Sequence, residues 1–343
     1  MVGKVKSSVR SGNALPSTLY GHVNRVRLIH KRRWEIIMSK PLGLPRVLRS
    51  ILVDFVDLNG PEALLPRRKE PIGHALLSRL LEVGSGLQIG TTCLNWSSTL
   101  GVVLRAMMCT AFSGGFRKAE LALPAGAKFD NMRIARSSLK WRIKGRVVSE
   151  PTLDQLHALQ RGDFAMVVPP PSKADQFGVF FGGRPLYFPF VPNSITNAAH
   201  ALAQLELKLP VEAGKRRSTP LFVSDDAFAP LAASLADRLL AGLLSAVLPP
   251  PERVKFSWHS FRIGLACALL AKGAPPELIQ AMCRWKSTQS LIIYARLNPE
   301  TYGSWVMKAH TATVSSIQTA NLPAFDDAAC AAILAQLADS EGN

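Results

Sequence analysis

The chain has 343 residues, of which 48% are hydrophobic and 19% charged, a composition typical of folded globular domains and not of disordered proteins. Its 41 lysines and arginines against 24 acidic residues give a formal charge of +17, which favours a polyanionic partner, nucleic acid before an acidic membrane surface. The longest apolar run is too short to cross a bilayer, no secretory signal is recognisable and the five cysteines form no CxxC pair, so we expect an intracellular protein without a metal site or a cofactor.

Basic residues dominate the first fifty positions, where eleven lysines and arginines accompany a single acid, Glu35. A Ser-Thr cap and apolar spacing predict a helix from residue 17 to the basic run at 31–33. A second apolar pattern predicts a short helix that ends near residues 59–60. A charged segment bounded by prolines follows at 65–71, so residues 1–66 are interpreted as a short, truncated helical DNA-binding region ahead of a larger domain.

The larger domain, residues 67–320, is expected to be mainly helical. Two apolar segments, 164–168 and 185–188, predict the strands of an antiparallel β-hairpin. An acidic tail at 321–343 contains a short predicted helix at 326–337. The fold class is therefore mainly α with a small antiparallel hairpin or sheet. Helical periodicity before residue 250 predicts the helices Ile72–Val83, Thr99–Phe112, Ile195–Leu207 and Leu231–Val247.

The clearest chemical pattern lies between residues 256 and 294. The chain has no GxxxxGK(S/T) loop, no HExxH and no GxSxG, so nucleotide hydrolysis, zinc proteolysis and esterase chemistry lack a motif. A helix is expected to open at Ser257 or His259, and the i,i+3 spacing places His259 and Arg262 on one face near its N-terminus. That end of a helix carries partial positive charge and favours a bound phosphate.

Twenty-three residues after Arg262 comes Trp285, and nine residues later comes Tyr294. With the residues around them this order resembles the tyrosine recombinase (phage integrase) family. In that family a His-x-x-Arg helix precedes a His or Trp, and a nucleophilic tyrosine follows on a later short helix. The resemblance covers about residues 67–310 and implies the DNA breaking-rejoining catalytic fold, preceded by a short helical region.

The same resemblance implies two further elements upstream. One is an arginine after a glycine turn with an acid three residues later, which Arg117 and Glu120 match. The other is a lysine at a β-hairpin turn, which Lys173 matches. The gap from Arg117 to Lys173 is longer than in compact family members and implies an insertion before the hairpin.

Each residue type suits phosphoryl transfer. The two arginines would clamp the non-bridging phosphate oxygens, because their planar guanidiniums stay charged. Tyr294 would form a 3′-phosphotyrosine without metal or ATP, and Lys173 would protonate the leaving 5′ oxygen. His259 would donate to the phosphate or assist the tyrosine proton, and Trp285 would donate its indole N–H.

Two of these roles have competitors within the chain. Lys140 or Lys144 could be the general acid in place of Lys173. Tyr302 could be the nucleophile, although the spacing selects Tyr294.

Basic side chains away from these residues predict a DNA-gripping surface, since neutralised phosphates supply affinity with little sequence information. We expect double-stranded DNA as the partner, a homo-tetramer on that DNA and no membrane contact. The predicted DNA-binding residues are Arg32, Arg33, Arg136, Lys140, Arg142 and Lys144.

Two features depart from the family pattern. Residues 1–66 are fewer than the usual core-binding domain, and Met282-Cys283-Arg284 stands where a glycine commonly precedes the Trp, so Cys283 fits only if its backbone needs no positive φ. Both favour a second interpretation, a catalytically degenerate DNA-binding remnant of a mobile-element recombinase. A third interpretation is a type IB topoisomerase. The residues around Lys173 and Trp285 are similar to recombinases of eukaryotic mobile elements, which implies a nuclear protein if the host is eukaryotic and a cytoplasmic one otherwise.

Overall fold

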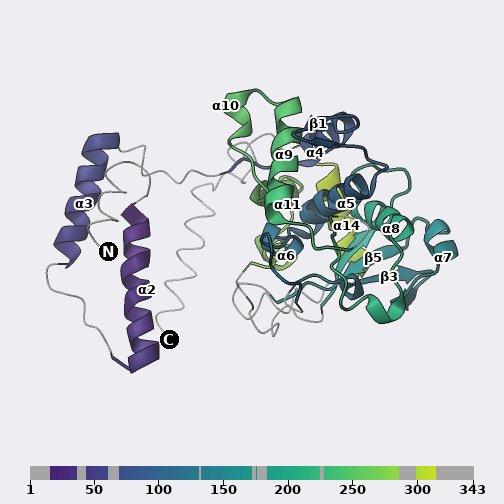
Figure 1. Ribbon diagram of the computed structural model, residues 1–343, viewed down its shortest axis with the longest axis horizontal. Coiled ribbons are helices and arrows are strands. Elements are labelled where there is room, and N and C mark those ends of the chain that lie inside the picture. Colours follow the sequence, from purple (N-terminus) through teal and green to yellow (C-terminus); the bar gives the residue numbers. More distant parts are fainter. Residues whose placement is uncertain are drawn as a thin grey trace. The chain divides into compact units, whose positions relative to one another are not determined.

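The computed structural model describes residues 16–36, 44–60, 69–130, 133–171, 175, 184–224, 228–285 and 299–313. The chain divides into two compact units, Met1–Arg68 and Lys69–Asn343 (Figure 1). The described residues are mainly helical with a small antiparallel sheet, which confirms the coarse fold class expected from the sequence. Within these ranges no helix is both long and apolar enough to cross a membrane.

The smaller unit contains the two helices predicted for it, α2 (Pro16–Trp34) and α3 (Leu44–Asn59), which contact each other. Ile51 and Phe55, four residues apart on α3, are buried, as expected for the apolar face of an amphipathic helix. The last turn of α2 carries three basic residues, Lys31–Arg33, and these complement the partial negative charge at the helix C-terminus.

The larger unit is built around α5 (Thr99–Gly114), most of whose residues are buried. Ser98 caps the start of α5 by accepting a hydrogen bond from the Gly101 backbone N–H at 3.1 Å. Gly115 ends the helix in the left-handed conformation, with φ 54°. Helices α8 and α11 pack against α5. The remaining described helical elements before α11 are α4 (His74–Val83), α6 (Lys118–Leu121), η2 (Arg136–Ser138), α7 (Leu153–His157), α8 (Ala198–Lys208), η3 (Ala213–Lys215), α9 (Ala233–Val247) and α10 (Pro250–Arg253).

The larger sheet has the order β4-β3-β5-β6, with every neighbouring pair antiparallel. Its strands are β3 (Leu139–Ile143), β4 (Arg146–Val148), β5 (Phe164–Val167) and β6 (Leu186–Pro189), and a separate two-stranded sheet joins β1 (Gln88–Ile89) to β2 (Thr92–Cys93). The predicted pairing of the 164–168 and 185–188 segments is confirmed, with Val167 opposite Leu186. Strands β3 and β4 were not predicted. Lys144 and Gly145, both with positive φ, form the two-residue turn between them.

Three helices from the C-terminal part complete the described fold: α11 (His259–Ala271), α12 (Pro276–Cys283) and α14 (Pro299–His310). Gly264 lets α11 approach the chain ahead of α4, because a Cβ there would lie 2.0 Å from the backbone oxygen of Ile72. The Ile72 N–H also donates to the Ser260 carbonyl at 2.9 Å. α14 packs against α11 and β6. These contacts fix the N-terminal half of α11 against the core.

Candidate functional site

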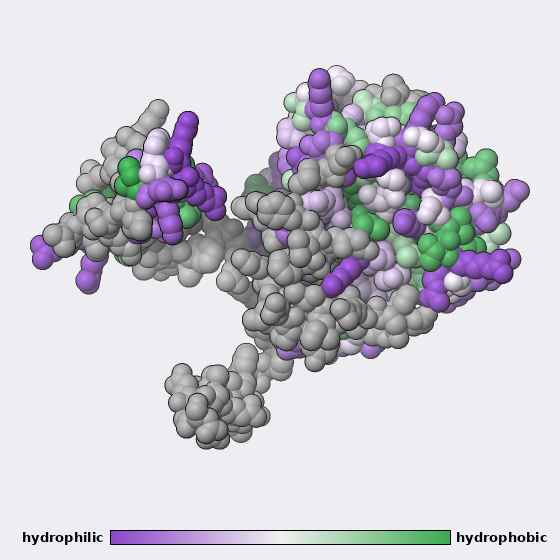
Figure 2. Space-filling view, turned by 90° about the horizontal axis from the view of Figure 1, so that it is seen from below, coloured by the Kyte–Doolittle hydropathy of each residue, from purple (hydrophilic) through white to green (hydrophobic). Residues whose placement is uncertain are grey.

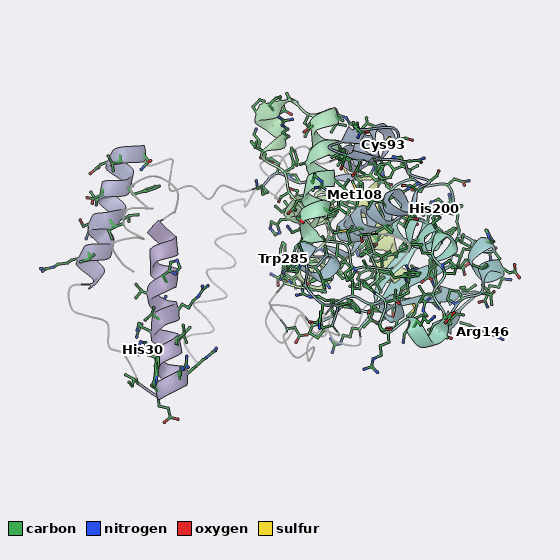
Figure 3. All side chains as sticks on the ribbon, viewed as in Figure 1. His30, Cys93, Met108, Arg146, His200 and Trp285 are labelled. Atoms are coloured by element: carbon green, nitrogen blue, oxygen red, sulfur yellow. The ribbon has the colours of Figure 1, made fainter. Side chains whose placement is uncertain are left out.

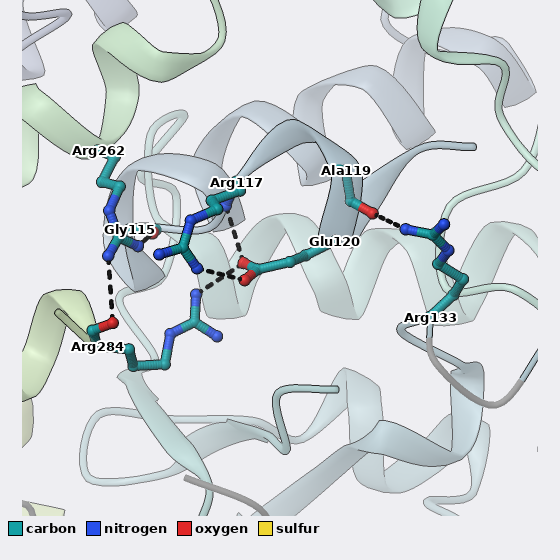
Figure 4. Close-up of polar contacts among 7 residues, drawn as sticks. All are labelled: Gly115, Arg117, Ala119, Glu120, Arg133, Arg262 and Arg284. Atoms are coloured by element: carbon teal, nitrogen blue, oxygen red, sulfur yellow. Dashed lines mark hydrogen bonds and ion pairs between the residues drawn. The ribbon is translucent and has the colours of Figure 1, made fainter. Parts of the chain in front are cut away.

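Four polar residues from three separate parts of the chain meet beside the end of α5 (Figure 4). Arg117 lies just before α6, and its backbone N–H donates to Glu120 Oε2 at 2.8 Å. Its guanidinium Nη1 donates to Glu120 Oε1 at 3.1 Å. Glu120 is only 5% exposed, whereas about a third of the Arg117 side chain remains accessible. The carboxylate therefore holds Arg117 in place while leaving it open to a ligand.

Arg262, on the first turn of α11, joins this cluster from the other side. Its Nη1 donates to the Gly115 carbonyl and its Nη2 to the Arg284 carbonyl at 3.4 Å. Arg262 is 2% exposed. The left-handed turn at Gly115 aims its carbonyl at the guanidinium, and a Cβ on Gly115 would lie 3.3 Å from Leu265 Cδ2. The glycine turn and the His-x-x-Arg helix, far apart in sequence, thus meet in one place.

Arg284 is a member of the cluster that the sequence analysis did not select. Its Nη2 donates to Glu120 Oε2 at 2.9 Å, and its guanidinium carbon lies 4.2 Å from the centre of the Phe116 ring. The left-handed residue is Arg284, with φ 51°, whereas Cys283 is the last residue of α12. The residue that adopts the positive φ is therefore Arg284, and Cys283 keeps a helical conformation. The available signal was a non-glycine residue directly before Trp285, where the family commonly has a glycine.

The charges in this cluster are unequal, with three guanidinium groups around one carboxylate. Burial by itself would raise the pKa of Glu120, but the neighbouring Arg284, the Arg117 backbone N–H and the other arginines outweigh burial and lower that pKa. Burial, with repulsion from Arg284 and Arg117, lowers the pKa of Arg262 to about 10. Glu120 and Arg262 are therefore both charged near neutral pH, and the excess of guanidinium groups over carboxylates suits an anion such as a phosphate.

His259 and Trp285 border the cluster. Partial burial of the His259 ring, followed by the positive charges of Arg262 and Arg117, lowers its pKa. The ring is therefore mainly neutral at pH 7 and able to accept a proton. The Trp285 backbone N–H donates to the Gln280 carbonyl at 2.9 Å, and its side chain is 38% exposed at the periphery of the larger unit (Figure 3).

Two of the six predicted catalytic residues, Lys173 and Tyr294, lie outside the described residues. Lys173 belongs to the connection between the paired strands β5 and β6, and Asp175, two residues later, is buried. Tyr294 follows Trp285 in sequence and precedes α14. In sequence, the last residue of the cluster, Arg284, comes ten residues before the predicted nucleophile.

Tyr302, the alternative nucleophile, is poorly placed for that role. It lies on α14 with its ring 6.0 Å from that of Tyr187, and burial raises the pKa of its hydroxyl. The hydroxyl has no hydrogen-bond partner among the described residues. A tyrosine that is enclosed and hard to ionise cannot readily reach a DNA phosphate.

The assignment of Arg136 to a DNA-binding surface is wrong. Its side chain is completely buried, with Nη1 3.5 Å from Glu206 Oε2 and 3.2 Å from the Leu209 carbonyl. Glu206 also pairs with Arg216 through two hydrogen bonds, at 3.0 and 2.7 Å. Arg136 therefore belongs to a buried ionic cluster that joins η2 to α8, and a partner seventy residues away in sequence could not be read from the local basic pattern.

The other predicted DNA-binding residues in the larger unit lie on or beside β3. Lys140 and Arg142 share the partly exposed face of the strand, alternating with buried Leu139, Trp141 and Ile143. Lys144 is exposed at the following turn. In Figure 2, hydrophilic side chains spread over the described face of this unit and separate the apolar residues into small groups.

Arg32 and Arg33 lie on α2 of the smaller unit, where both are exposed. The Arg33 guanidinium carbon lies 5.6 Å from the centre of the Trp34 ring. The two residues therefore offer positive charge beside an exposed aromatic side chain.

Comparison with protein-family models and with curated proteins found no match to this chain.

Proposed function

We propose that the chain is a tyrosine recombinase that cleaves and rejoins DNA strands through Tyr294, in a tetramer on double-stranded DNA. The observation that carries this proposal is the arginine pair Arg117 and Arg262. The pair is held by Glu120 and the Gly115 carbonyl, beside a His259 ring that is mainly neutral. A buried carboxylate and a backbone oxygen preorganise two fixed cations, which is what a phosphoryl-transfer transition state requires.

The proposed step is an in-line displacement at a DNA phosphodiester. The Tyr294 hydroxyl oxygen attacks phosphorus, its proton passes to His259, and the bond from phosphorus to the 5′ oxygen breaks. Lys173 supplies a proton to that oxygen, which leaves as a 5′ hydroxyl. The arginines bind the non-bridging oxygens, and Trp285 donates its indole N–H to the phosphate. Reversal with a different 5′ hydroxyl rejoins the strand and releases the tyrosine.

A suicide-substrate assay tests the proposal. Nicked duplexes taken from the flanks of the gene are incubated with wild type, Tyr294→Phe and the matched control Tyr302→Phe. We expect a covalent protein–DNA band, stable to denaturation, with wild type and Tyr302→Phe and none with Tyr294→Phe. A band lost only in Tyr302→Phe would move the nucleophile to α14. Tight DNA binding without a band from any of the three proteins would favour the DNA-binding remnant.

A further inference from the structure

Arg284 adopts a backbone conformation that arginine rarely adopts. Directly after α12 it has φ 51° and ψ 47°, and its N–H donates to the Ala281 carbonyl at 3.1 Å. Glycine is the usual residue at such a helix end because it has no Cβ to clash with the backbone. The next residue, Trp285, follows this turn with an exposed side chain.

The Arg284 side chain points inward and is 3% exposed. One nitrogen, Nη2, binds Glu120, while Nε and Nη1 have no hydrogen-bond partner among the described residues. Stacking on Phe116 at 4.2 Å compensates only in part for burying those N–H groups. Glu120 already accepts two hydrogen bonds from Arg117. Pairing of the carboxylate alone therefore does not account for a second arginine that is buried beside it in a strained backbone conformation.

We propose that Arg284 is a positioning residue for the two phosphate-binding arginines, an inference that rests on the proposed function. Its guanidinium fixes Glu120, which fixes Arg117, and its carbonyl accepts a hydrogen bond from Arg262. One residue thus connects both cations to the turn that presents Trp285. A phosphodiester would meet the two arginines already at their working separation, and the cost of ordering them is met on folding.

The first test separates the side chain from the backbone. Arg284→Gly keeps the turn without strain and removes the guanidinium. Arg284→Lys keeps a positive charge but loses the planar guanidinium that stacks on Phe116 and its set of N–H donors. Arg79→Lys is the matched control, because Arg79 lies on α4 and donates a hydrogen bond to the Val247 carbonyl at the C-terminal end of α9, not to a residue of this cluster. Each variant is assayed for the rate of covalent complex formation at saturating nicked DNA, for DNA affinity and for thermal unfolding.

We expect Arg284→Gly to lower the rate by about 10- to 100-fold and the DNA dissociation constant to change by less than about threefold. Arg284→Lys should recover part of the rate, and Arg79→Lys should match wild type. A rate within about twofold of wild type in Arg284→Gly would overturn the proposal. So would a loss of rate that only follows a loss of folded protein in the melting curves.

A double-mutant cycle with Glu120→Gln tests the route. If Arg284 acts through Glu120, the double variant should be no slower than the slower single variant, whereas independent effects would multiply and contradict this route.

A measurement without DNA distinguishes failure of this inference from failure of the proposed function. Water exchange of the Arg117 Nε–H proton, followed by NMR with labelled arginine, should accelerate about tenfold or more in Arg284→Gly and remain unchanged in Arg79→Lys. Unchanged exchange in Arg284→Gly overturns the positioning role whatever the activity. Accelerated exchange in a protein that never forms a covalent complex overturns the recombinase proposal and the catalytic purpose of the arrangement, and leaves the coupling between the arginines standing.

Discussion

Arg262 shows how a single side chain links the fold to the proposed chemistry. Two of its nitrogens are engaged by backbone carbonyls, of Gly115 and Arg284, so the direction of the guanidinium is set before any ligand arrives. A planar fork can satisfy two separate carbonyls and still present a further N–H to a phosphate oxygen. A lysine ammonium is a point charge on a flexible stem, so it cannot bond both carbonyls and a phosphate oxygen in a fixed geometry.

Arg262→Lys is therefore expected to lower the rate of covalent complex formation by about 100-fold, the usual effect of removing one preorganised donor to a transition state. DNA affinity should change little, since the positive charge remains. Single-turnover cleavage of nicked DNA measures the rate, with Arg253→Lys as the control because the Arg253 guanidinium donates to Ser245 Oγ in an exposed position. A rate equal to wild type would mean that the reaction does not need the guanidinium of Arg262 to be held by both carbonyls.

At the scale of elements, α14 is held to the core by a buried histidine. His310 on α14 is hydrogen-bonded through Nε2 to Ser113 Oγ at 3.1 Å, and its ring lies 5.4 Å from His74 and 5.2 Å from Phe112. Burial, together with the neighbouring His74, lowers the pKa of His310 to about 3. Burial also lowers the pKa of His74. Acid must therefore charge a group that the folded protein holds neutral.

The sign of the pH effect follows from that difference. Below pH 6.5 the His310 ring is protonated in the unfolded chain. In the folded chain, whose His310 pKa is about 3, the ring stays neutral until the pH falls to about 3. The free energy of unfolding should thus fall on acidification, by up to about 1.4 kcal/mol per pH unit for this group. Urea unfolding at pH 7, 5.5 and 4.5 should show a shallower loss in His310→Phe than in wild type. Parallel pH profiles would show that His310 titrates normally.

For the whole molecule, the formal charge of +17 should make DNA binding strongly dependent on salt. Lys140 and Arg142, on one face of β3, are the described pair from which we expect phosphate contacts. Replacing both with glutamine should weaken binding to every duplex alike and reduce the slope of log affinity against log salt by about 2. Lys215→Gln, which removes an exposed lysine paired with Glu212, is the control. An unchanged slope in the double variant would exclude this face from the DNA.

The sequence could predict elements wherever local patterns determine them. The strand at 164–168 and the helix from His259 were predicted from apolar periodicity and neighbouring turn residues, and the structure contains both. Strand β3 was missed because its alternation of buried and basic residues was interpreted only as a positive patch. The wrong assignment of Arg136 and the omission of Arg284 have one cause, since each side chain is held by an acidic partner distant in sequence, Glu206 for Arg136 and Glu120 for Arg284. Such pairings form only in the folded chain, and the local sequence around each arginine does not name its acidic partner.

The proposed reaction joins Tyr294 covalently to a DNA 3′ phosphate. The most direct measurement is mass spectrometry of the complex trapped on a nicked duplex, after nuclease and protease digestion. We expect one peptide containing Tyr294 to carry the mass of a 3′-phosphonucleotide, and fragmentation to place that mass on the tyrosine. The same adduct on Tyr302 or on any other residue, or a trapped complex joined through a 5′ phosphate, would contradict the account.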